Sequence, residues 1–182
     1  MKNRFHLLSV SMILLISVVA CKSPREKLVL RIDEGEKKLF NDSTKMLNAE
    51  VAVDVLNAYK EYADKFPEDT IAPVYLFKAG ELSGGMNKYN EALELYSRLR
   101  EKYPDHRKAA VSLFLQAFIY DTNLREKEKA KQLYAEFMKQ YPDHQLFPSA
   151  QASYDQLNMG LSDEDLIKMF EARQDSLAKA GK

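Results

Sequence analysis

The sequence has one cysteine, no tryptophan, and only six glycines and six prolines among 182 residues. A single cysteine excludes a disulfide within the chain, so the fold must be held together by its apolar core. Because glycine and proline are scarce while 30% of the residues are charged, the composition suits a helical protein with solvated outer faces. Basic and acidic residues are balanced at 27 each, which gives no support to nucleic-acid binding.

The first 20 residues are typical of a signal peptide, with a basic start at Lys2 and Arg4 and an apolar run over residues 7–20. This run is too short for a comfortable membrane-spanning helix. It ends in Val18-Val19-Ala20-Cys21, which resembles a bacterial lipobox and implies cleavage before Cys21 and lipidation of Cys21. The alternative is a plain secretory protein with a stray thiol.

This resemblance divides the chain into a lipoprotein signal peptide (1–20), a lipidated tether (21–27) and a helical domain (28–182). The residue after the cysteine is Lys22, where inner-membrane lipoproteins of enteric bacteria resemble one another in carrying aspartate. The tether also lacks the acidic run of surface-exported lipoproteins. We therefore expect a lipid anchor in the outer membrane, with the domain on its periplasmic face.

An internal repeat organises the rest of the chain. The segment YNEALELYSRLREKYPDH at 89–106 recurs as KEKAKQLYAEFMKQYPDH at 127–144, with a weaker copy at 52–69. The prolines that close the three copies are 37 and 38 residues apart. Apolar residues recur at intervals of three and four, so each copy is predicted to be an amphipathic helix. A period of this length predicts an all-α solenoid.

The same periodicity predicts eight helices, at about 26–40, 48–66, 71–82, 89–103, 107–120, 126–141, 146–157 and 162–178. In the first, Leu28, Ile32, Leu39 and Phe40 form the apolar stripe, and Gly35 is a weak point. Glycines 84 and 85 are expected to end the third helix with a left-handed cap. The fifth has almost no polar face, so we expect it to be buried or to line a groove that a partner covers.

These segments resemble the tetratricopeptide repeat (TPR) over about residues 41–159. The residues at the family's spacing are Leu76, Ala79, Gly80, Tyr89, Ala92, Tyr96, Leu99 and Pro104, and then Phe114, Ala117, Ala130, Tyr134, Phe137 and Pro142, with Phe118 where a small residue is usual. The resemblance implies a right-handed solenoid of helical hairpins, with about three repeats and a C-terminal capping helix. It also implies a concave partner-binding face that includes Phe77, Glu81, Leu115 and Ile119.

The long period and the Tyr-Pro-Asp endings are similar to those of envelope TPR proteins of the BamD-like and YbgF-like types. The anchor favours the first type. The resemblance implies a periplasmic scaffold lipoprotein that binds envelope proteins or peptide segments, in outer-membrane protein assembly or envelope maintenance. The alternative is an accessory subunit of an envelope hydrolase or transporter that captures peptide or glycan.

Residues suited to catalysis are few. Outside the signal peptide the only histidines are His106 and His144, which follow equivalent prolines and are expected to lie in the turns before the next helices. Phosphate-binding loops and the common hydrolase and metalloprotease motifs are missing from the sequence. We therefore expect no enzyme activity, cofactor or metal, and no nucleic-acid partner, and leave the oligomeric state open.

Replacing Cys21 with serine tests the lipid anchor. We expect Cys21→Ser to give a soluble or uncleaved protein, because the chain after residue 21 has no other apolar run long enough to hold a membrane. Cell fractionation measures this. A variant that stays in the outer-membrane fraction at the normal level would contradict the lipobox interpretation.

Overall fold

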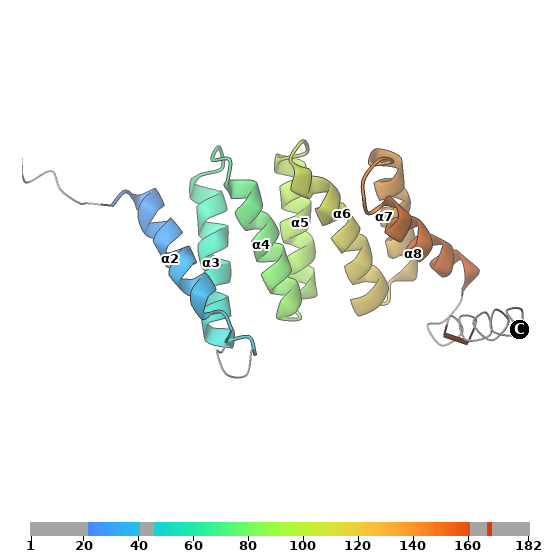
Figure 1. The fold of residues 1–182 in the computed structure, drawn as a ribbon, viewed down its shortest axis with the longest axis horizontal. Helices are drawn as coiled ribbons and strands as arrows, with labels where there is room; N and C mark the ends of the chain where they lie inside the picture. The colour runs from blue at the N-terminus through green and yellow to red at the C-terminus, as the bar shows by residue number, and fades with distance from the viewer. Residues whose placement is uncertain (1–21, 41–45, 161–166, 169–182) are drawn as a thin grey trace, which may run out of the picture. The chain divides into compact units, whose positions relative to one another are not determined.

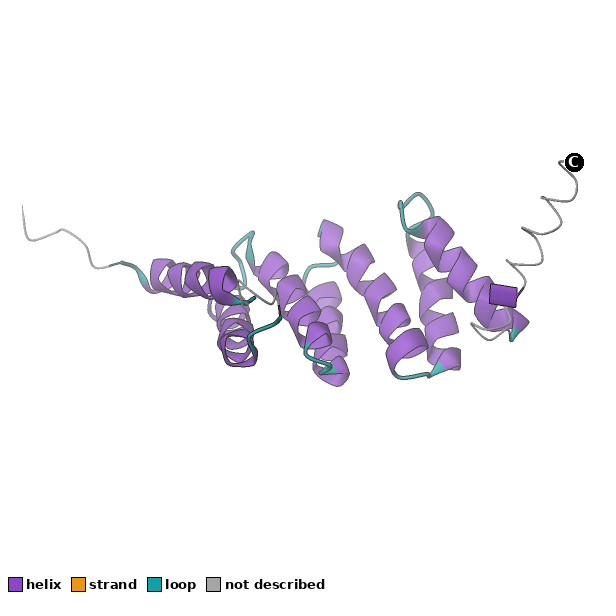
Figure 2. Ribbon diagram, turned by 60° about the horizontal axis from the view of Figure 1, so that its bottom comes forward, coloured by secondary structure: helices purple, strands orange, loops and turns teal. Residues whose placement is uncertain are grey.

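Two compact units make up the chain in this computed structural model, which describes residues 22–40, 46–160 and 167–168. The chain divides between Phe66 and Pro67. The regular elements of the described residues are all helices (Figure 2), apart from an isolated bridge between Phe40 and Leu47. The prediction of an all-α fold is confirmed.

The first unit pairs helix α2 (Pro24–Lys38) with helix α3 (Ala49–Lys65). A capping box starts α2, because the Ser23 hydroxyl accepts a hydrogen bond from the Glu26 backbone N–H at 3.2 Å. The Ser23 N–H donates in turn to the Glu26 carboxylate at 2.8 Å. Pro24 suits the first turn, where its missing N–H would have no helical partner. The helix therefore begins within the segment that was expected to be a tether.

Helix α2 packs on α3 through Leu28 and the fully buried Ile32. The expected continuation of this stripe to Phe40 is wrong, because the helix ends at Lys38 and the Phe40 side chain is 56% exposed. The interpretation of Gly35 as a weak point is also wrong. A Cβ atom there would overlap Cγ2 of Val55, so Gly35 is where the two helices approach most closely.

The second unit is a row of antiparallel helices, each packed against the next in chain order (Figure 1). Its elements are α4 (Ala72–Gly85), α5 (Tyr89–Lys102), α6 (Arg107–Phe118), the π-helix η1 (Ile119–Asn123), α7 (Lys127–Gln140) and α8 (Phe147–Met159). Helix α4 also touches α6, its counterpart in the next hairpin. The predicted solenoid of helical hairpins is confirmed.

Aromatic rings between small residues form the core of the second unit. The Tyr134 and Phe137 side chains are fully buried on α7, and the Phe114 ring of α6 lies 5.7 Å from each of their ring centroids. Alanines 117 and 130 are also fully buried in this cluster, and they leave the space that the rings fill. Edge-on and tilted rings at this distance stabilise one another beyond the area that they bury.

The turn between α4 and α5 differs from the prediction. Glycines 84 and 85 lie inside α4 and do not end it. The left-handed residue is Asn87, with φ of 60°, one position after the C-cap. Asparagine tolerates this conformation because its short side chain can form local hydrogen bonds, and its Oδ1 accepts one from the Tyr89 hydroxyl at 2.6 Å.

The expected burial of the whole of α6 is also wrong. Its buried side is made by small and polar residues as well as by Leu113, and the Phe118 side chain is 45% exposed. The π-helix η1 follows directly, where the sequence predicted a continuing α-helix and then a turn. A π-helix holds one more residue per turn, so it changes which side chains face inward.

Three of the predicted features lie outside the described residues. They are the signal peptide with Cys21, the turn and capping cluster at 41–44, and most of the C-terminal capping helix. No helix among the residues that the structure does describe is both long and apolar enough to span a membrane.

Two glycines of α4 give a matched test of helix packing. A Cβ atom on Gly80 would lie 2.8 Å from Cδ1 and Cζ of Tyr96, whereas one on Gly84 would meet nothing. We expect Gly80→Ala to lower the free energy of unfolding by about 1–3 kcal/mol through overpacking. The control Gly84→Ala should raise it by about 0.5–1 kcal/mol, because alanine is the better helix former. Denaturant unfolding measures both, and equal effects would contradict the close contact.

Candidate protein-interaction surfaces

The four residues predicted to bind a partner lie on the two helices that meet across neighbouring hairpins. Phe77 and Glu81 are on α4, Leu115 is on α6, and Ile119 opens η1. The Phe77 and Ile119 side chains are only 3% and 7% exposed, so they are not available as they stand. Leu115 is partly exposed and Glu81 is exposed. Their binding role stays a prediction, which the structure narrows to Glu81 and Leu115.

Phe77 is covered by neighbours that the sequence did not reveal. Its ring centroid lies 5.8 Å from that of Tyr96, and the Lys108 Nζ atom from α6 lies 3.9 Å above it. A lysine ammonium held over an aromatic face is a favourable cation–π contact. Lys108 therefore joins α6 to α4 while leaving its positive charge near the surface.

Glu81 lies in the electrostatic field of the same lysine. Partial shielding from water raises the pKa of the Glu81 carboxyl, and the nearby charges of Lys108 and Lys78 oppose that rise. The carboxylate is exposed enough to meet a partner. The area thus offers one acidic and two basic side chains to an incoming segment.

The exposed side of α6 is apolar. Val111 and Leu115 are partly exposed and four residues apart, and the more exposed Phe118 follows three residues later. This spacing places the three side chains on one stripe of the helix. The sequence analysis missed Phe118, because it assigned that position to the packing site of a small residue. Its only sequence signal was this departure from the repeat pattern.

A polar network links α5, α6 and α7. The buried Gln116 amide donates to the Ser97 hydroxyl at 2.7 Å and to the Leu93 carbonyl at 3.0 Å. Its carbonyl accepts from the Arg100 guanidinium at 2.8 Å, and Arg100 also pairs with the Glu136 carboxylate. Because a buried amide is costly without partners, these bonds fix the register between neighbouring hairpins.

One buried phenol is not suited to chemistry. Burial raises the pKa of Tyr134 to about 12, helped by the negative charge of Asp121, while Ser153 opposes the rise. The hydroxyl therefore stays neutral at ordinary pH and cannot act as a nucleophile. No group of three or more His, Cys, Asp or Glu side chains among the described residues is placed to hold a metal ion.

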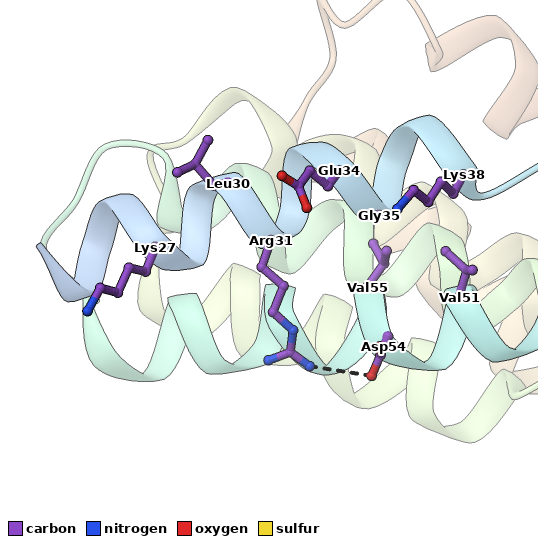
Figure 3. A pocket seen from close by; sticks show the side chains of 9 residues that line it. All are labelled: Lys27, Leu30, Arg31, Glu34, Gly35, Lys38, Val51, Asp54 and Val55. Atoms are coloured by element: carbon purple, nitrogen blue, oxygen red, sulfur yellow. Dashed lines mark hydrogen bonds and ion pairs between the residues drawn. The ribbon is translucent and has the colours of Figure 1, made fainter. Parts of the chain in front are cut away.

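The first unit has a groove of about 400 Å³ between α2 and α3 (Figure 3). Its lining residues are Lys27, Leu30, Arg31, Glu34, Gly35, Lys38, Val51, Asp54 and Val55. The basic and acidic side chains on its walls partly neutralise one another, and Arg31 reaches across it to pair with Asp54 at 3.4 Å. An open groove of mixed charge does not define a small-molecule site, which is normally concave and mostly apolar.

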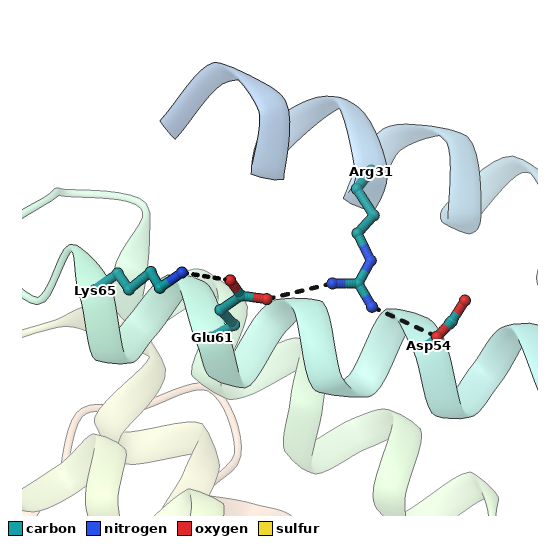
Figure 4. A network of polar contacts seen from close by, with 4 residues as sticks. All are labelled: Arg31, Asp54, Glu61 and Lys65. Carbon is teal, nitrogen blue, oxygen red and sulfur yellow. Dashed lines mark hydrogen bonds and ion pairs between the residues drawn. The ribbon is translucent and has the colours of Figure 1, made fainter. Parts of the chain in front are cut away.

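Arg31 is the centre of an ion-pair chain along α3 (Figure 4). Its guanidinium lies 3.2 Å from Glu61, which is also 2.7 Å from the Lys65 ammonium. The Lys65 hydrogen bond is the main cause that holds the pKa of Glu61 below its ordinary value. The Arg31 charge is therefore directed onto α3.

The two histidines serve as equivalent caps. The His106 Nδ1 atom accepts a hydrogen bond from the Lys108 N–H at 3.2 Å at the start of α6. The His144 Nδ1 atom accepts one from the Leu146 N–H at 3.1 Å just before α8. This geometry agrees with the prediction that both lie in helix-starting turns.

The described fold is that of a helical-hairpin repeat protein. Residues 75–106 and 111–144 match the tetratricopeptide repeat family, so the second unit contains two tetratricopeptide repeats, formed by α4 with α5 and by α6 with α7. No curated protein matches the chain. Repeats of this kind generally mediate protein–protein interactions, and the apolar stripe on α6 is a surface suited to that role.

The His106 cap predicts a pH dependence of stability. Burial, and then the charges of Arg107 and Lys108, lower the pKa of His106. The folded chain therefore binds the proton less readily than the unfolded chain. The stabilisation is complete above the unfolded pKa of about 6.5 and is lost as pH falls through that value towards the folded pKa.

We expect His106→Asn to reduce this loss, because asparagine also caps helices but does not titrate. The measurement is the melting temperature of both proteins at a series of pH values from neutral to mildly acidic. The variant should lose less stability across the series than the parent. The same slope for both proteins would show that His106 does not contribute.

Proposed function

We propose that the protein is a scaffold lipoprotein, held at the outer membrane by acyl chains on Cys21, whose repeat unit binds other envelope proteins in the periplasm. The lipobox-like sequence before Cys21 and the two tetratricopeptide repeats support this proposal. A role in outer-membrane protein assembly or envelope maintenance is supported only by the resemblance of the long repeat to those of envelope TPR proteins.

The observation that carries the proposal is the apolar stripe of Val111, Leu115 and Phe118 on α6. A large aromatic side chain that is 45% exposed is unfavourable in water unless a partner covers it. The charged side chains of Glu81 and Lys108 lie on the helices that adjoin this stripe. A partner that packs an apolar side chain on Phe118 and pairs its own charges with these two side chains satisfies the whole surface.

A helix or an extended segment is the form of partner that fits a helical surface of this kind. Such segments bind through a few apolar anchors spaced along one face, with polar contacts at the rim. Aromatic residues are enriched among those that carry most of the binding energy at interfaces. Phe118 is therefore the residue whose loss should weaken binding most.

Photo-crosslinking in cells tests this function. We expect a crosslinking amino acid at position 115 or 118 to capture an envelope protein, because both side chains reach the surface. Positions 77 and 119 are unsuitable, since their side chains are buried. Glu94 on α5 is the control, because it is exposed but lies outside the α6 stripe.

The captured band must depend on the surface itself. Phe118→Ser should abolish capture from position 115 and leave the melting temperature close to that of the parent, because an exposed ring contributes little to the core. A band that survives Phe118→Ser, or that forms equally from position 94, would contradict the α6 site. Crosslinks only within the chain would show that the stripe is not a partner-binding surface.

A further inference from the structure

The first turns of α2 form a surface that the repeats do not explain. Lys22, Arg25 and Lys27 are exposed there, and the half-buried Val29 and Leu30 lie beside them. A shallow groove of about 310 Å³ is lined by Lys22, Arg25, Glu26, Val29 and Leu30. We call Lys22, Arg25, Lys27, Val29 and Leu30 the α2 basic face. Basic side chains around an apolar centre are typical of helices that lie on lipid surfaces.

The charge of this face is not neutralised by neighbouring acids. Glu26 is the only acidic residue between positions 22 and 31, and its carboxylate is held by the Ser23 backbone N–H in the helix cap. That hydrogen bond is the main cause that lowers the pKa of Glu26. Arg25 lies with its guanidinium 5.8 Å from the Tyr62 ring centre, a contact that keeps its positive charge. Arg31 is paired with α3 and does not belong to the face.

The position of this face in the chain is the second observation. The capping box places the start of α2 at Ser23, which is only two residues after Cys21. At ~3.5 Å per residue, at most about 7 Å of chain separates the two. This is shorter than the Debye length of about 8 Å at physiological ionic strength. An acyl chain on Cys21 would therefore hold the first turn of α2 within the electrostatic field of the headgroups.

We propose that the α2 basic face docks on an anionic lipid bilayer, with its three basic side chains at the phosphates and Val29 and Leu30 at the edge of the acyl region. The proposal deepens the proposed lipid anchor, since it makes α2 a second membrane contact. Stable attachment generally needs two such signals. The face binds through its own side chains, so it can be tested on the chain without lipid.

The lack of tryptophan in the sequence allows a specific fluorescence test. Residues 22–182, with no acyl group, carry the single substitution Val29→Trp and are mixed with phosphatidylcholine vesicles with or without phosphatidylglycerol. We expect the indole emission to shift to the blue only when phosphatidylglycerol is present. The matched control Met159→Trp places the indole on a residue that is 64% exposed in the second unit, and it should show no shift.

Charge variants of the Val29→Trp chain then identify the contact. Each basic residue near an anionic surface strengthens binding about fivefold, so the triple change Lys22→Gln, Arg25→Gln and Lys27→Gln should weaken vesicle affinity on the order of 100-fold. The control is Lys37→Gln with Lys38→Gln, at the other end of the same helix, which should stay within a few-fold of the parent. Raising the salt concentration should also release the parent.

The outcomes separate this inference from the anchor. The proposal is overturned if the Val29→Trp emission does not shift on anionic vesicles, or if the triple variant binds as tightly as its control. An acidic protein as the true occupant of the face would give the first of these results. The anchor is read independently, by the mass of the chain purified from cells. Vesicle binding with an unmodified Cys21 would support the α2 basic face and reject the anchor.

Discussion

The distance between paired helices in the second unit depends on how closely a tyrosine ring approaches small residues on the facing helix. The Tyr96 ring lies where a side chain on Gly80 would have to be, so glycine is required for α4 and α5 to pack as they do. Fully buried alanines play the same part beside Tyr134 in the next hairpin. Because side chains in a protein interior fill space almost completely, these contacts set the position of each helix along the row.

One position breaks this rule and gives the surface its character. Phe118 lies 38 residues after Gly80, as Tyr134 lies 38 residues after Tyr96. A phenylalanine cannot fit into the space that Gly80 leaves for a tyrosine, and its ring is instead turned outward. The α-helix ends at the same residue and continues as a π-helix. The loss of a small residue therefore creates both an irregular helix end and an exposed aromatic side chain, a combination often found at functional sites.

Sequence periodicity predicted the helices well, because apolar residues at intervals of three and four must face one side. It could not predict which end of a stripe leaves the helix, and so Phe40 was placed on the wrong surface. Glycine was also misjudged twice. Gly35 was read as a weakness and Gly84 as a helix stop, whereas the structure uses the first for close packing and keeps the second inside α4.

The surfaces were harder to predict than the helices. Whether Phe77 is open depends on Lys108, which is 31 residues away and covers it from the next hairpin. The capping box that starts α2 is visible in the sequence as Ser23 with Glu26 three residues later. That signal was overlooked, because the segment was assigned to a tether on the strength of the lipobox alone.

The packing in chain order also determines how the second unit gains and loses its structure. Its extensive helix contacts join segments that are adjacent or next but one along the chain. Proteins whose contacts are this local fold quickly, since little loop-closure entropy has to be overcome. For the same reason α7 and α8 can open as a pair while α4 and α5 stay folded, as the nearest-neighbour energetics of repeat proteins allow. A segment bound across α4 and α6 would couple the two hairpins and make their opening cooperative.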